Sequence, residues 1–156
     1  TYNNLFVVRS FSKAFGLAGL RVGYLIGCKN LINKIGLVIN KKDVNLVGQF
    51  ASCLCLDNKL YMTDFVTEVK EQQIRISSFF TEKGFKNNFG DGNFLMVKVS
   101  NPQEFIKKCA SENLFIRDRS YLPNLSNYVR FTIGDKNSMD RLISILENIN
   151  LSSYLI

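Results

Sequence analysis

Ser10–Tyr24 read SFSKAFGLAGLRVGY, and this stretch decides how the rest of the chain is interpreted. It places Lys13 between two hydroxyl side chains and a run of small residues, with Arg21 eight positions on. The flanking residues 5–8 and 22–26 are apolar and uncharged, so we expect two short buried strands. Lysine is rarely buried without a partner, and burial readily lowers its pKa. Lys13 is therefore a candidate amine nucleophile.

The bulk composition is that of a folded globular chain. The 156 residues are 46% hydrophobic and 21% charged. No run of about 18 apolar residues is present, so we expect no transmembrane helix, and no signal-peptide pattern is visible. The chain begins at Thr1, shortly before the first predicted strand. We therefore expect a piece of a longer polypeptide, cut just upstream of the lysine stretch.

The net charge is +7. Nucleic-acid binding is one interpretation, but the basic residues are dispersed, and the adjacent pairs Lys41-Lys42 and Lys107-Lys108 belong to no known nucleic-acid motif. A solvated surface with an anion-binding site is the better interpretation. We expect neither a nucleic-acid partner nor a membrane partner.

The cysteines are Cys28, Cys53, Cys55 and Cys109, and the chain has no histidine. No CxxC pair occurs, so a zinc site would need thiolates from scattered positions, and we expect no metal. We expect buried, reduced and inert thiols, which fits a cytoplasmic location. The absence of histidine also excludes Ser-His and Cys-His catalysis within this chain.

Apolar spacing and cap residues predict the remaining elements. The predicted helices are one capped by Asn30 and ending near Val38, Leu46–Leu56 opened by Asn45, Lys59–Lys83 ended by Gly84, one opened by Asn101-Pro102, and a last one capped by Ser138 with Leu142, Ile145, Leu146 and Ile149 inward. Further strands are predicted at 94–99, 114–117 and 128–133. Lys41-Lys42-Asp43 is expected to be a polar connection.

The lysine stretch resembles the active-site motif of the fold-type I, pyridoxal-phosphate (PLP) dependent class I/II aminotransferases, and is most similar to the histidinol-phosphate aminotransferase group. In that family a lysine in the pattern Ser-x-Ser-Lys-Ala-Phe-Gly-Leu-Ala-Gly-Leu-Arg-x-Gly forms the internal Schiff base. The resemblance implies an α/β fold. Residues 1–58 would end the PLP-binding large domain, 59–83 would form a bridging helix, and 84–156 would form a small C-terminal α+β domain.

The same resemblance implies pyridoxal 5'-phosphate as the cofactor and Lys13 as the Schiff-base lysine. Positions matching Ser12 and Arg21 bind the cofactor's phosphate in the family, and the position of Ser10 does so in related aminotransferases. Hydroxyl and guanidinium groups suit a phosphate, because they donate directed hydrogen bonds to its oxygens. Turn formation is the alternative role of the two serines.

Substrate-binding residues are implied in the second half. Arg130, in YVRFTIG, lies in an apolar strand and needs an anionic partner, and it matches the family arginine that binds the substrate's carboxylate. Arg117 matches a family arginine near the substrate, unless it pairs with Asp118 or another neighbour. Asn93 matches a family asparagine near the substrate. Asn45 resembles a residue before a large-domain helix, although Lys42-Asp43 replaces the usual nearby proline; a helix cap explains Asn45 equally well.

The resemblance covers only the C-terminal half of the family. The other half would supply a glycine-rich phosphate loop, an aromatic ring stacked on the cofactor, an aspartate for the pyridinium nitrogen and a tyrosine. The longer polypeptide would act as a homodimer on small amino and keto substrates, with glutamate as the expected donor and histidinol phosphate and imidazole acetol phosphate as the reference pair. We expect these residues alone to be inactive.

Two alternatives stay open. One is a PLP-dependent decarboxylase of a phosphorylated amino acid, which shares the architecture of this group. The other is a truncated, non-catalytic domain that acts as a binding partner.

Overall fold

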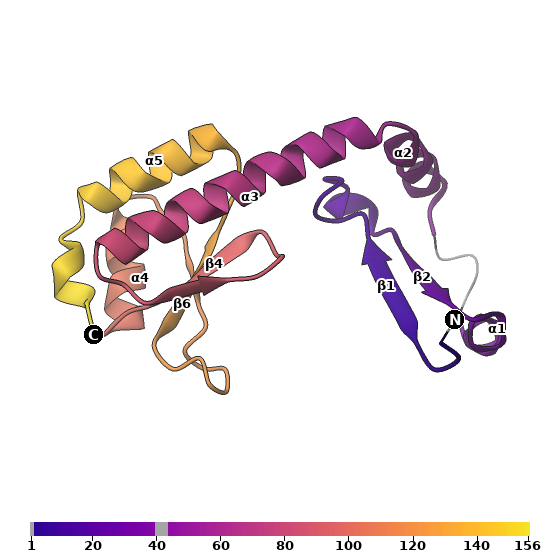
Figure 1. Cartoon of the computed structure of the whole chain (residues 1–156), viewed down its shortest axis with the longest axis horizontal. Coiled ribbons are helices and arrows are strands. Elements are labelled where there is room, and N and C mark those ends of the chain that lie inside the picture. The colour runs from indigo at the N-terminus through magenta and orange to yellow at the C-terminus, as the bar shows by residue number, and fades with distance from the viewer. Residues whose placement is uncertain (1, 40–43) are drawn as a thin grey trace. The chain divides into compact units, whose positions relative to one another are not determined.

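The computed structural model describes residues 2–39 and 44–156. The chain divides into two compact units, Thr1–Phe65 and Val66–Ile156. The division falls inside helix α3, Lys59–Glu82, which Figure 1 shows as one continuous ribbon. The predicted connection Lys41-Lys42-Asp43 lies outside the described residues. The assignment of residue ranges to the family's two domains stays a prediction.

The first unit is built on a pair of antiparallel strands. β1, Phe6–Ser10, pairs with β2, Gly23–Gly27, so that Ser10 lies opposite Gly23. A short 3-10 helix, η1, Ala18–Leu20, lies in the loop between them. Helices α1, Lys29–Gly36, and α2, Leu46–Asp57, follow.

The expectation that both strands are buried is wrong for this structure. Val8 is 75% exposed and Ile26 is 52% exposed. Within the described residues β1 and β2 pair only with each other, and a two-stranded sheet has too little area to cover its own side chains. Phe11 and Val22, at the two ends of the lysine loop, are the buried apolar side chains of the described part of this unit.

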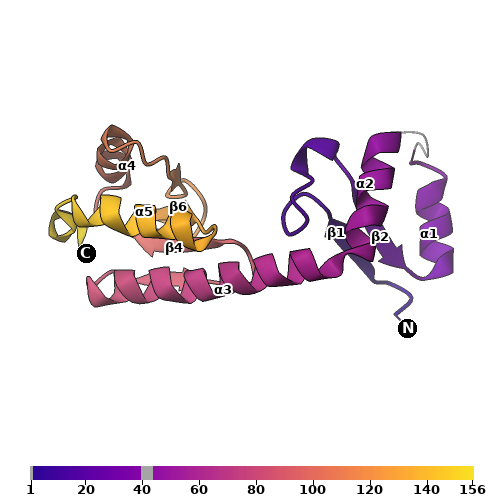
Figure 2. The same ribbon diagram turned by 90° about the horizontal axis from the view of Figure 1, so that it is seen from above.

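The second unit is an antiparallel sheet with helices over one face. The strands are β3 (Asn87–Phe89), β4 (Phe94–Lys98), β5 (Arg117–Asp118) and β6 (Tyr128–Thr132), in the order β3-β4-β6-β5. The helices are the later part of α3, α4 (Pro102–Ser111) and α5 (Lys136–Glu147), followed by the short η2 (Leu151–Tyr154). α3 and α5 lie side by side in both views (Figures 1 and 2).

The core of the second unit lies between this sheet and its helices. Successive side chains of a strand face opposite sides, so Val97 and Phe131 point toward the helices while Met96 and Arg130 occupy the other face. Phe80 of α3 is fully buried in the same cluster. Each side chain of this size contributes about 1.5–3 kcal/mol when fully buried. The inward residues predicted for α5 also pack in this cluster, with Ile145 only partly buried.

Several helix boundaries are confirmed. Asn45 caps α2 by accepting a hydrogen bond from the Gly48 amide at 2.7 Å. Asn101 caps α4 with Pro102 in the first turn. α3 ends before Gly84, whose φ of +87° lies in the left-handed region where glycine carries no steric cost.

Two predicted caps and one predicted strand are wrong. α1 begins directly after β2, so Cys28 rather than Asn30 precedes it. α5 is capped by Asp135, whose carboxylate accepts the Ser138 amide at 2.8 Å, so Ser138 lies inside the helix. The strand predicted at 114–117 is also wrong, because β5 begins only at Arg117. Leu114 still belongs to the end of α4: its amide donates to the Cys109 carbonyl at 2.9 Å.

The expectation that all the cysteines are buried is wrong. Cys109 is buried in the core of the second unit, whereas Cys53 is exposed and Cys28 and Cys55 are intermediate. Cys109 is covered by the core of the second unit, whereas few described residues cover the apolar side chains of α2. In the part of the chain that the structure describes, no helix is long and apolar enough to cross a membrane.

Candidate cofactor and substrate sites

The Lys13 loop joins β1 to β2 and is closed by backbone hydrogen bonds. The Phe11 amide donates to the Val22 carbonyl at 3.1 Å, and the Leu17 amide donates to the Phe11 carbonyl at 2.9 Å. The Gly16 amide donates to the Lys13 carbonyl at 2.9 Å, with Gly16 at a φ of +71°. Lys13 therefore opens a tight turn, and its side chain is exposed.

The two predicted hydroxyls lie at the start of this loop. Ser10 Oγ accepts a hydrogen bond from the Ser12 amide at 3.1 Å, so Ser10 does shape the turn. A hydroxyl that accepts a hydrogen bond keeps its own proton, and Ser10 can still donate to a further acceptor. The Ser12 side chain is half-buried. Turn formation and anion binding are therefore compatible roles here.

Arg21 lies on the returning side of the loop, next to buried Val22. Its φ of 56° is left-handed, which is uncommon for a residue with a side chain. Arg21 Nη1 donates to the Ala18 carbonyl at 3.1 Å. Arg21 directly precedes Val22, whose carbonyl accepts the Phe11 amide just beyond the last β1–β2 pair.

The cationic groups of this loop fit an anionic ligand. Among residues 2–39 and 44–156, no ion pair involves Lys13 or Arg21. An amine and a guanidinium without an acidic partner among the described residues, together with hydroxyl groups in the same loop, form a donor set that suits a phosphate ester.

Asn45 connects this loop to α2. Its Oδ1 accepts from the Gly48 amide, and its Nδ2 donates to the Leu20 carbonyl at 2.9 Å. The predicted cap is thus confirmed, and the amide has a second contact that the sequence did not indicate.

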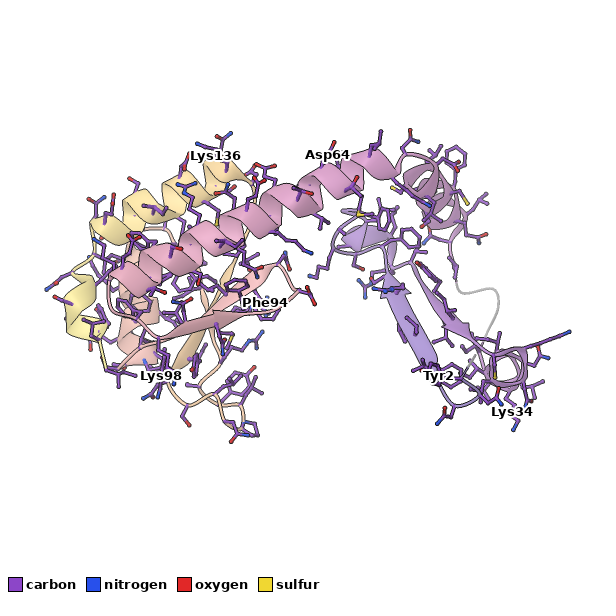
Figure 3. All side chains as sticks on the ribbon, in the orientation of Figure 1. Tyr2, Lys34, Asp64, Phe94, Lys98 and Lys136 are labelled. Carbon is purple, nitrogen blue, oxygen red and sulfur yellow. The ribbon has the colours of Figure 1, made fainter. Side chains whose placement is uncertain are left out.

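Arg130 lies on the face of the second unit's sheet that the helices leave free. Its guanidinium carbon is 5.6 Å from the centroid of the Phe94 ring, which Figure 3 labels on β4. Arg130 Nε is buried and has no hydrogen-bond partner within the described residues. Partial burial lowers the pKa of Arg130, and the nearby Arg119 and Arg117 charges lower it further. The expected anionic partner is thus not supplied by the described residues.

Arg117 lies directly opposite Arg130 in the β5–β6 pair. The alternative role, an ion pair with Asp118, is not found among the described residues. The Asp118 carboxylate instead accepts the Ser120 amide and hydroxyl at 2.8 and 2.6 Å and the Gln103 amide at 2.6 Å. Its hydrogen bonds with Ser120 lower the pKa of Asp118.

Arg119 is a member of this cluster that sequence reasoning missed. Its amide donates to the Tyr128 carbonyl at 3.0 Å, so the β5–β6 ladder continues and Arg119 faces the same side as Arg117. Arg119 Nη1 donates to the Tyr121 hydroxyl at 2.8 Å. The signal in the sequence was the Arg-Asp-Arg alternation next to a strand.

Asn93 is exposed at the start of β4 and has no side-chain hydrogen bond within the described residues. Its backbone is held firmly: the Asn93 carbonyl accepts the Ile133 amide at 2.9 Å. The buried Gln73 of α3 donates to the carbonyls on either side, of Gly92 at 2.8 Å and Phe94 at 2.9 Å. Gln73 was also missed, although a glutamine on the apolar side of an amphipathic helix could have indicated it.

The predicted residues thus form two groups. Ser10, Ser12, Lys13 and Arg21 share one loop of the first unit. Arg117 and Arg130 come together on the second unit's sheet, and Asn93 directly precedes its strand β4.

The chain matches the family model for aminotransferase class I and II over residues 1–146. It therefore belongs to the class I and II aminotransferases, as the lysine motif indicated, and pyridoxal phosphate is the cofactor of that family.

Curated relatives match most of this chain. A histidinol-phosphate aminotransferase of Ruminiclostridium cellulolyticum is 34% identical over 152 residues, which is 94% of this chain and 42% of that protein. The dihydroxyacetone phosphate transaminase Cj1437c of Campylobacter jejuni is 35% identical over 141 residues, 88% of this chain and 38% of that protein. The chain spans about two fifths of the length of these relatives.

The fold agrees with this membership. The histidinol-phosphate aminotransferase structure from Clostridium acetobutylicum matches with a TM-score of 0.86 at 24% identity, covering 94% of this chain and 46% of that one. The predicted α/β fold of a fold-type I aminotransferase segment is confirmed.

Proposed function

We propose that this chain carries the cofactor lysine and part of the substrate site of a PLP-dependent aminotransferase. The enzyme would move an amino group between an amino donor and a phosphorylated keto acceptor. The observation that carries the proposal is the Lys13 loop, where an exposed amine, hydroxyl donors and the Arg21 guanidinium lie together without an acidic partner in the described part of the chain.

In this proposal Lys13 is the residue whose amine would hold the cofactor at its aldehyde carbon. Ser10 and Ser12 donate hydrogen bonds to the phosphate, and Arg21 adds a charged contact. When bound, the cofactor draws electrons away from the substrate's Cα. The Lys13 amine would also be the base that takes the proton from the substrate's Cα.

The arginine cluster favours a phosphorylated substrate. Arg117 and Arg130 face each other directly, and Arg119 adds a third positive charge on the same face. A dianionic phosphate balances such a cluster better than a single carboxylate does. The names of both relatives above contain a phosphorylated compound. We therefore propose that Arg130 binds the substrate's phosphate, and not the carboxylate that the family motif suggested.

The lysine assignment is tested with the natural polypeptide that carries this sequence. Addition of PLP is expected to give the visible absorption band of an imine. Lys13→Ala is expected to abolish the band, and Lys34→Ala, at an exposed lysine of α1, is expected to keep it. A band that survives Lys13→Ala would end the assignment.

The substrate assignment is tested through Arg130. Arg130→Ala is expected to raise KM for a phosphorylated substrate about 10- to 100-fold, because a hydrogen bond to a charged group contributes about 1.5–3 kcal/mol. The matched control is Arg141→Ala on α5, which belongs to the helix layer on the other face. Equal effects of the two variants would remove Arg130 from the substrate site.

The alternatives give different products. A decarboxylase would release CO2 from a phosphorylated amino acid and form no keto product, whereas a non-catalytic domain would show no imine band.

The 156-residue chain alone is expected to be inactive, and transamination by it would contradict that. The homodimer and the cytoplasmic location also stay predictions, for sedimentation and cell fractionation to test.

A further inference from the structure

Asn45 uses both ends of its side-chain amide, and the two ends reach different elements. Oδ1 caps α2 at the Gly48 amide, 2.7 Å away. Nδ2 reaches back along the chain to the Leu20 carbonyl, 2.9 Å away. We propose that Asn45 is a positioning residue for Arg21: it holds the turn that directs the Arg21 guanidinium to the cofactor's phosphate. The inference rests on the proposed function of the Lys13 loop.

The bonded carbonyl is the one that governs the backbone of Arg21. The Leu20 carbonyl belongs to the peptide plane that precedes Arg21, and φ of Arg21 is the rotation of that plane against the residue. A left-handed residue with a Cβ costs roughly 1–2 kcal/mol and persists only where its surroundings fix it. The Asn45 bond therefore acts on the torsion that is unusual at Arg21, whose φ is 56°.

A close contact holds the other side of Arg21. A Cβ added at Gly48 would lie 2.6 Å from Val22 Cγ2, so the first turn of α2 packs directly against the residue after Arg21. Arg21 Nη1 also donates to the Ala18 carbonyl, which fixes the direction of the side chain. Three successive residues are therefore held in place. Asn45 bonds the Leu20 carbonyl, the Arg21 side chain bonds the Ala18 carbonyl, and Val22 packs against Gly48.

Capping alone does not explain the Nδ2 bond. Asn101 caps α4 with its Oδ1, and its Nδ2 bonds Glu104 Oε2 within the same helix at 3.2 Å. Serine and asparagine are similar N-caps, but serine has no second donor to reach a distant carbonyl. Asn45→Ser therefore keeps the cap and removes the bond to Leu20, while Asn101→Ser makes the same change where no such bond exists.

The experiment uses the natural polypeptide and compares PLP with pyridoxal, which lacks the phosphate. Asn45→Ser is expected to weaken PLP binding about tenfold, as for loss of one charged hydrogen bond, and to change pyridoxal binding less than about twofold. Asn101→Ser is expected to change neither. In an Arg21→Ala background, Asn45→Ser is expected to have no further effect on PLP, because residues acting through one contact are not additive.

A second measurement needs no cofactor. A left-handed φ brings the amide and Hα protons of Arg21 close together, so their NOE should be strong in the wild type and weaker in Asn45→Ser. An unchanged NOE, or equal losses of PLP and pyridoxal binding, would overturn the inference while leaving the cofactor loop intact. If the wild type binds PLP no tighter than pyridoxal, the phosphate role of Arg21 itself fails, and the inference fails with it.

Discussion

Single polar side chains organise both candidate sites. Asn45 reaches the Lys13 loop, and Gln73 reaches the carbonyls that flank Asn93. Lys13 and Arg21 were predictable as candidate site residues because they belong to a long motif with fixed spacing. The second contacts of Asn45 and Gln73 were not, because a long-range bond to a backbone carbonyl depends on where the chain folds back.

The reactivity of each cysteine depends on how deeply its thiol is buried. Burial raises the pKa of the Cys109 thiol to about 12, so Cys109 stays neutral at pH 8. Cys53 is exposed on α2. We expect iodoacetamide to modify Cys53 rapidly and Cys109 only after unfolding, as mass spectrometry of the native chain would measure. Rapid native modification of Cys109 would contradict this packing.

The same thiol links stability to pH. The unfolded thiol titrates near 9.0 and the folded thiol near 12. The stability that the neutral thiol contributes is therefore fully present below pH 9 and is lost as the pH rises from there toward 12. Cys109→Ser, whose hydroxyl does not titrate in this range, is expected to flatten this part of the stability profile measured by urea unfolding. An identical slope in both proteins would remove Cys109 as its cause.

At the scale of elements, α3 joins the core to the Asn93 segment. Its period of apolar residues predicted the helix to within a residue, and Gly84 predicted its end. The errors at Asn30 and Ser138 arose because several residues near each start can cap a helix. Which residue does so depends on where the preceding strand or loop releases the chain.

The attachment of α3 to β4 can be measured. Gln73→Leu is expected to lower the free energy of unfolding by about 1–3 kcal/mol, because it removes the donor to two carbonyls at a buried position. The control is Gln72→Leu, at a buried glutamine whose side chain accepts a hydrogen bond from Arg75 and, within the described residues, bonds no backbone carbonyl of the sheet. Urea unfolding followed by circular dichroism reports both, and equal losses would contradict the special role of Gln73.

At the scale of the whole molecule, the two units differ in their cores. The described cluster of buried apolar side chains runs from Val69 to Tyr154, whereas Phe11 and Val22 are the buried apolar residues described before it. The apolar strands around the lysine motif looked like core in the sequence. Their exposure here follows from pairing only with each other.

Hydrogen exchange of the 156-residue chain should reflect this difference. We expect the amides of β4 and β6 to exchange slowly, because both strands are paired on both sides and covered by helices. The amides of β1 and β2 are expected to exchange much faster. Comparable protection of the two strand pairs, measured by mass spectrometry, would show that the first unit is more stable than its packing indicates.

The sequence by itself determined the family, the candidate lysine within its motif, the long helix and most strand positions, because these depend on local spacing and on an unbroken motif. Only the tertiary structure decided that Arg119 joins Arg117 and Arg130, that no described acidic residue pairs with them, and that Asn45 bonds the Leu20 carbonyl before Arg21. These facts depend on strand register and on contacts between residues far apart in the chain. Such contacts leave no periodic trace in one sequence.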